Sequence, residues 1–99
     1  MTSDQERQLQ VMVARLDAFE KRELALSSLI TDLDGLFNAV GFDDQQWREG
    51  FWRSWGELEI NYAFALDMGW KSLDETSEQL VAKAVADLKS LIATKLQQG

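Results

Sequence analysis

The side chains in this sequence that could do chemistry are its carboxylates and its tryptophans. The 99 residues include seventeen Asp and Glu and four Trp, with no Cys and no His. Without thiolates and imidazoles, the chain lacks the usual zinc ligands, Cys-His dyads and Ser-His-Asp triads. What remains is a hard cation held by carboxylate oxygens, acid or base catalysis by a carboxylate, or recognition of another molecule through charge and aromatic surface.

Two short carboxylate motifs have the spacing of metal ligands, but neither is complete. Glu20-x-x-Glu23 resembles one half of the motif with which all-helical nucleotide pyrophosphohydrolases hold magnesium, and no Glu-x-x-Asp follows at a usable separation. Asp32 and Asp34 are two residues apart on a predicted helix, so their side chains diverge by about 200°. We therefore expect no catalytic residue, no metal site and no cofactor, and we expect the chain not to be an enzyme.

Glu59 and two of the tryptophans are candidates for a more specific role. Glu59 falls at the edge of an aromatic stripe, where it either accepts a structural hydrogen bond from a core Tyr or Trp or anchors a basic partner. Trp47 and Trp55 fit the core. Trp52 lies well round the helix from the centre of the stripe, and Trp70 follows a helix-ending glycine. Each of these two belongs either to the core or to an interface, where Trp is enriched.

The net charge of −7 is concentrated in the middle of the chain. Residues 27–71 contain eight acidic and three basic residues, which gives −5 for this segment. Such a segment repels phosphate backbones and anionic lipids, so we expect neither nucleic acid nor a membrane as partner. The charge is either scattered for solubility or forms one field that steers a basic partner. The candidate binding residues of this region are Asp32, Asp34, Asp43, Asp44, Glu49, Trp52, Glu57, Glu59, Asp67 and Trp70.

The pattern of apolar residues predicts that helices position these side chains. No proline occurs, no segment alternates as a strand does, and apolar residues recur every three or four positions. We expect one all-α domain over residues 1–99, a bundle of about four helices with a central tryptophan-rich helix. The expected helices run from Ser3 or Asp4 to about Lys21, from Ser27 or Ser28 to Gly41, from Asp43 or Asp44 to Gly69, and from Ser72 onward.

Polar residues at the expected starts of the helices predict their caps. Ser3-x-x-Glu6 and Ser72-x-x-Glu75 have the spacing of capping boxes. Glu23 interrupts the apolar stripe, which favours a break over residues 22–26. A constant seven-residue register from Leu9 to Val40 leaves one long helix as the alternative.

The C-terminal half of the third expected helix is apolar on nearly its whole circumference. Its core stripe comprises Trp47, Phe51, Trp55, Leu58, Tyr62 and Leu66. Ile60 and Phe64 project close to the opposite side, which predicts burial between neighbouring helices. Gly56 and Ala63 would let another helix approach closely. On the outer face, the predicted pairs are Glu49 with Arg53 and Arg53 with Glu57.

Two segments resemble a known family, the small acidic all-helical immunity proteins of bacterial contact-dependent growth inhibition and polymorphic toxin systems. The segments are LSSLITDLDGLFNAV and WREGFWRSWGELEINYAFALDMG, and the resemblance covers the chain from about Leu24 onward. It lies in the order of helix, acidic turn, tryptophan-rich helix and amphipathic helix. The resemblance implies a protein that binds and neutralises a cognate basic toxin domain, often a nuclease that acts on tRNA or DNA.

The N-terminus and the absence of a long apolar run complete these expectations. The segment MTSDQERQLQ lacks the basic and then apolar pattern of a secretory signal, and no apolar run approaches the ~18 residues of a membrane span. We therefore expect a cytoplasmic protein. The alternative function is a structural helical module that forms a homodimer, or a subunit of a larger assembly, through Trp52, Ile60 and Phe64.

Overall fold

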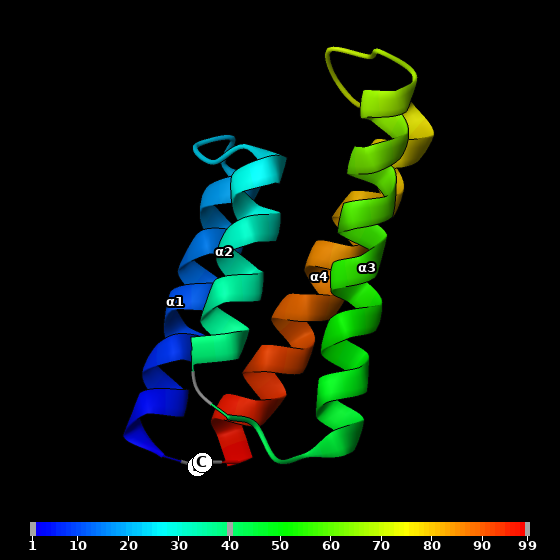
Figure 1. Ribbon diagram of the computed structural model, residues 1–99. Helices are drawn as coiled ribbons and strands as arrows, with labels where there is room; N and C mark the ends of the chain where they lie inside the picture. The colour runs from blue at the N-terminus through cyan, green and yellow to red at the C-terminus, as the bar shows by residue number, and fades with distance from the viewer. Residues whose placement is uncertain (1, 40, 99) are drawn as a thin grey trace.

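The computed structural model describes residues 2–39 and 41–98 and contains four α-helices (Figure 1). These are α1 (Ser3–Glu20), α2 (Leu26–Ala39), α3 (Gln45–Asp67) and α4 (Glu75–Gln98). The described residues form no strand. The expected all-α bundle of about four helices, with its tryptophan-rich third helix, is confirmed.

The helices run alternately up and down around one core (Figure 1). Each packs against two others: α1 with α2, α2 with α3, α3 with α4, and α4 with α1. The molecule measures 42 × 25 × 20 Å along its principal axes. Apolar stripes spaced at three and four residues meet in its centre, and burying them drives the packing. The fully buried large side chains are Leu9, Met12, Leu16, Leu29, Leu33, Phe51, Leu58, Val81, Val85, Leu88 and Ile92.

The break between the first two helices is confirmed, and one continuous helix is therefore wrong. After Glu20, the backbone N–H of Glu23 donates to the carbonyl of Ala18 at 2.8 Å, and Arg22 adopts a φ of 63°. A non-glycine residue in this left-handed region costs about 1–2 kcal/mol. The chain then reverses, because the apolar side chains of α1 and α2 must face one another.

The N-cap of α3 is confirmed at Asp44, whereas those expected for α1 and α4 are displaced along the chain. Thr2 forms the capping box of α1 with Gln5, in place of Ser3 with Glu6. Asp74 accepts from the backbone N–H of Ser77 at 2.8 Å, so it takes the role expected of Ser72.

The start of α2 also differs from the expectation, by one or two residues. Ser27 and Ser28 lie in its first turn rather than before it, since the helix begins at Leu26. Its last described residue is Ala39, and the inward position expected for Val40 lies outside the described residues. Several polar residues lie close together at each of these helix starts, so the sequence alone does not show which of them is the N-cap.

The α3–α4 hairpin is longer than the α1–α2 hairpin and extends past its end (Figure 1). At 1.5 Å per residue, α3 spans roughly 34 Å and α2 roughly 21 Å. The turn at the far end begins with Gly69 at a φ of 71°, and the backbone N–H of Trp70 donates to the carbonyl of Ala65 at 2.9 Å. The α1–α2 turn stops short of this turn (Figure 1).

This overhang contradicts the burial expected for the second half of α3. Trp47, Phe51 and Leu58 are buried, but Leu66 is 60% exposed, although it continues their stripe. Ile60 and Phe64 are 66% and 50% exposed, so the expectation that they are enclosed by neighbouring helices is wrong. Ile60 and Phe64 lie about 180° and about 140° around α3 from Phe51, so they face away from the core. Leu66 lies beyond the part of α3 that α2 covers, since α2 begins only at Leu26 and its Ile30 already lies opposite Trp55.

The close approach of two helices occurs at Gly50 rather than at Gly56 or Ala63. A Cβ at Gly50 would lie 3.4 Å from Leu91 Cδ1 on α4, whereas one at Gly56 would meet nothing within 4 Å. Ala63 is exposed. Periodicity placed the small residues on the helix but could not tell which of them faces α4.

None of the four helices, over the described residues, combines the length and the hydropathy needed to cross a membrane.

Candidate functional site

The ten candidate binding residues are spread along the whole length of α3 and over its neighbours. Asp32 and Asp34 lie on α2, Asp43 and Asp44 precede α3, and Trp70 follows it. Glu49, Trp52, Glu57, Glu59 and Asp67 lie on α3 itself. Asp44 and Asp67 are separated by the full helix, roughly 34 Å at 1.5 Å per residue. The structure therefore does not bring all ten together on one surface.

Two of the carboxylates have structural partners. Asp32 Oδ2 lies 3.5 Å from Arg15 Nε, which joins α2 to α1. Asp44 accepts from the backbone N–H of Trp47 at 3.1 Å and lies 3.5 Å from Lys95 Nζ on α4. The backbone hydrogen bond from Trp47, aided by Lys95, holds the pKa of Asp44 below its ordinary value of 3.8. Asp32 and Asp44 therefore serve the fold.

Asp34 and Glu49 make only local hydrogen bonds. Asp34 Oδ1 accepts from the side chain of Asn38 at 3.0 Å, one turn later on α2. Glu49 Oε1 accepts from Gln45 at 3.1 Å. Both side chains are exposed, and Asp43 in the connection between α2 and α3 is exposed too. These carboxylates are accessible to a partner.

The remaining carboxylates of α3 are exposed as well. No ion pair joins Arg53 to Glu49 or to Glu57 among the described residues, so both predicted pairs are wrong. The hydrogen bond to Asp87 is the main cause that raises the pKa of Lys83 on α4, and the charge of Glu57 adds to it. Glu57 therefore lies on the side of α3 that faces α4. Glu59 is exposed, and within the described residues it accepts no hydrogen bond from Tyr62 or a tryptophan.

Trp52 is half-buried in an aromatic cluster between α2 and α3. Its ring centroid lies 4.6 Å from that of Phe37, 5.0 Å from Phe51 and 5.2 Å from Trp55, at angles of 58–88°. Trp55 Nε1 donates to the carbonyl of Ile30 at 2.9 Å, which ties the same cluster to α2. Trp52 therefore packs mainly as part of the fold.

The overhang of the α3–α4 hairpin carries the large apolar side chains that the fold leaves uncovered. We define the hairpin-end patch as Ile60, Phe64, Met68 and Leu80, which are 44–66% exposed. The first three are four residues apart and so lie on one side of α3. Leu80 comes from the adjoining part of α4. Sequence analysis found Ile60 and Phe64 but not Met68 and Leu80, since periodicity alone does not reveal where a bundle stops.

Trp70 supports this patch at its edge. Its ring lies 5.3 Å from that of Phe64 at 79°, and the side chain is half-buried. Asp67 and Glu57 are one turn from Phe64 and Ile60 on the same helix, so carboxylates flank the patch. Two candidate acids and one candidate tryptophan therefore surround an apolar centre.

The side chains between α3 and α4 at this end are small or polar. Asn61 and Ser77 are 6% exposed, as is Ala65, and Asn61 Nδ2 donates to the carbonyl of Glu57 at 2.7 Å. The larger apolar side chains thus point outward and the smaller ones inward. This inversion costs folding energy unless another molecule covers the outer side.

The carboxylates with metal-like spacing are separated or engaged in ion pairs. Glu20 Oε1 and Asp17 Oδ1 both lie 2.7 Å from Lys89 Nζ. Their hydrogen bonds, with that of Asp17 foremost, raise the pKa of Lys89 above 10.5. In the described residues, no group of three or more carboxylates is placed to hold a metal ion.

Comparison with protein-family models, with curated proteins and with solved structures gives no match for this chain.

Proposed function

We propose that the chain acts by binding rather than by catalysis, and that it is an immunity protein that neutralises a basic toxin domain in the cytoplasm of the bacterium that makes both. The observation that carries this proposal is the inverted hairpin end, where Ile60 and Phe64 are exposed while Asn61 and Ser77 are buried. Exposed apolar patches with polar rims are typical of protein interfaces.

The charge of the chain supports a basic partner. Glu57 and Asp67 flank the hairpin-end patch, and the whole chain carries −7. Such a field speeds the association of a basic protein, whereas desolvated apolar and aromatic side chains slow its dissociation. Both properties suit an inhibitor that must capture a toxin before it acts. The proposed contact set is narrower than the candidate set, because Asp32, Asp44 and Trp52 serve the fold.

The test is gel filtration and stopped-flow association with the toxin domain encoded by the adjacent upstream gene. We expect a stable complex at micromolar concentration, with an association rate that falls as salt rises. Ile60→Ser with Phe64→Ser should raise Kd about tenfold or more, since apolar anchors at an interface centre carry much of the affinity. The absence of any complex would overturn the proposal.

Two matched controls test whether the position of each substitution matters, for the apolar side chains and for the charges. Leu66→Ser removes an equally exposed apolar side chain from a different side of α3, so it should leave Kd unchanged. Glu57→Gln with Asp67→Asn should slow association. Asp4→Asn with Glu6→Gln, on α1, neutralises the same number of charges and should slow it less. Equal slowing by both double variants would show that only net charge matters.

A homodimer through the same patch is the second candidate, favoured by the apolar character of Ile60, Phe64 and Leu80. Two copies would each bring a charge of −7 to the interface, which opposes this association at low salt. Sedimentation of the chain alone decides between the candidates. A monomer agrees with the immunity function, and a tight dimer that persists at every salt concentration favours the structural module.

A further inference from the structure

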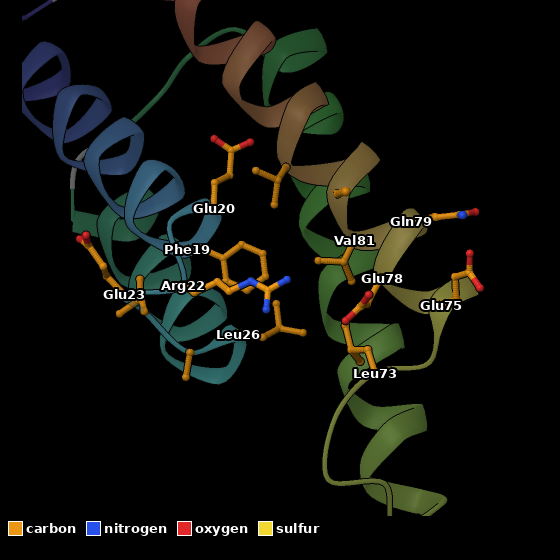
Figure 2. A pocket seen from close by; sticks show the side chains of 14 residues that line it. Phe19, Glu20, Arg22, Glu23, Leu26, Leu73, Glu75, Glu78, Gln79 and Val81 are labelled. Atoms are coloured by element: carbon orange, nitrogen blue, oxygen red, sulfur yellow. The ribbon is translucent and has the colours of Figure 1, made fainter.

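A groove lies between the α1–α2 turn and the first half of α4, where the longer hairpin extends past the shorter one. Its volume is about 980 Å³. The apolar lining consists chiefly of Phe19, Leu24, Leu26, Leu73, Val81 and Val85. Figure 2 shows Phe19 and Leu26 on one wall directed toward Leu73 and Val81 on the other. Phe19, Leu24, Leu26 and Leu73 are only half-buried, so much of this apolar surface faces solvent.

The charged residues that line the groove are mostly acidic. Glu20, Glu23, Glu75 and Glu78 contribute four carboxylates, against the single guanidinium of Arg22. The four glutamates are all exposed. Figure 2 shows Arg22 and Glu78 directed toward each other across the groove, and no ion pair joins them among the described residues.

This composition does not suit a small polar ligand. Sites for such ligands place a few converging polar groups within an apolar cavity. Here the acidic groups are exposed, and the described residues contain no buried side-chain nitrogen or oxygen without a hydrogen-bond partner. The apolar lining and the acidic rim of the groove therefore suit an apolar surface with basic edges better than they suit a metabolite.

We propose that this groove binds an amphipathic helix of a partner protein, with a row of apolar side chains seated between the α1–α2 turn and α4. Lys or Arg residues along the edges of that helix pair with Glu75 and Glu78, since Glu20 is already paired with Lys89. Helices bind in apolar grooves in this way through anchors at positions i, i+3, i+4 and i+7. A second copy of this chain is a poor occupant, because it would bring a charge of −7 to an acidic rim.

The proposal is independent of the hairpin-end patch. Leu80 of the patch and Ala82 of the groove are two residues apart on α4, so their side chains point about 200° apart around the helix axis. One surface can be altered without the other, and each proposal can fail alone.

The test uses a synthetic Lys/Leu peptide of about 14 residues, which forms roughly four amphipathic helical turns. A second peptide of the same composition, with the leucines scattered around the helix, controls for charge. In titrations followed by backbone amide NMR shifts of the full chain, the amphipathic peptide should perturb residues around Phe19, Leu26 and Val81. Equal binding of the scattered peptide, or shifts centred on Ile60 and Phe64, would overturn the proposal.

A pair of matched substitutions on α4 adds a second readout. Ala82→Arg fills the groove from an exposed position and should raise the Kd of the amphipathic peptide about tenfold. Ala93→Arg makes the same change three turns later on the same helix, at an exposed position outside the groove, and should leave Kd unchanged. Both positions tolerate Arg in a helix, so folding is preserved. Equal Kd values for the two variants would contradict docking in the groove.

Discussion

Single residues decide where this chain turns. Arg22 follows the C-cap of α1 at a φ of 63°, and Gly69 follows α3 at 71°. Glycine accepts this conformation without strain, whereas arginine does not. The sequence signalled the second turn by its glycine. The turn between α1 and α2 contains no glycine, and the interruption of the apolar stripe at Glu23 was what indicated it.

We predict that Arg22→Gly stabilises the protein by about 1 kcal/mol, because it relieves the left-handed strain at this position. Lys21→Gly is the matched control. The backbone of Lys21 has a φ of −81°, so glycine there should bring only an entropic cost. Urea unfolding of the two variants measures both effects. A loss of stability in Arg22→Gly would contradict the role assigned to this backbone conformation.

The capping carboxylates Asp44 and Asp74 should make stability depend on acidic pH. Backbone N–H groups of Trp47 and Ser77 donate to them and hold the pKa of each below 3.8. A carboxyl with a lowered folded-state pKa contributes stability above 3.8, and that contribution is lost as the pH falls through the folded-state value.

Asp44→Asn with Asp74→Asn should therefore flatten the pH dependence between about pH 5 and about pH 2. Asn also caps helices well, so the stability of this variant near pH 7 should stay close to that of the wild type. Unfolding curves across this pH range provide the measurement. Parallel curves for the two proteins would show that these carboxylates do not carry the dependence.

At the scale of elements, α3 changes character along its length. Its first half packs Trp47 and Phe51 into the core, whereas its second half buries Leu58 on the same side and exposes Ile60 and Phe64 on other sides. The second half is the more apolar in sequence. Ile60 and Phe64 lie about 180° and about 140° around α3 from Phe51, so they face away from the core, on the side of the exposed Arg53.

We predict that Leu58→Ala and Ile60→Ser differ sharply in their cost. Leu58 is 0% exposed, and its truncation should destabilise by about 2–5 kcal/mol. Ile60 is 66% exposed, and its replacement should cost less than about 0.5 kcal/mol. Thermal unfolding of the isolated chain gives both values. A large cost at Ile60 would indicate that this side chain is covered in solution, as in a homodimer.

At the scale of the whole molecule, two hairpins of unequal length meet around one core. The unequal lengths leave the end of the longer hairpin uncovered and open the acidic groove beside it (Figure 2). The groove follows from this mismatch. Ile60 and Phe64 of the hairpin-end patch are exposed for another reason, because they face away from the core on α3.

We predict that the hairpin end opens more readily than the centre of the bundle. Its interior holds Asn61, Ala65 and Ser77 in place of large apolar side chains, so local opening exposes little apolar surface. Amides of residues 62–67 and 75–79 should exchange with deuterium faster than those of residues 84–92. A bound partner should slow exchange at the hairpin end, and uniform protection in the free chain would contradict the prediction.

The sequence by itself determined the helices, because apolar spacing and capping groups act within a few residues of one another. It favoured the break before α2, narrowed the cap of α3 to Asp43 or Asp44 and located the acidic middle segment, since these features are local too. Which apolar residues remain exposed was known only from the packed bundle, since it depends on which side of each helix its neighbours cover. The tertiary structure also assigned Asp32 and Asp44 to contacts with other helices and brought the walls of the groove together. Burial and charge pairing depend on segments that are distant in the chain, and periodicity along one helix carries no information about them.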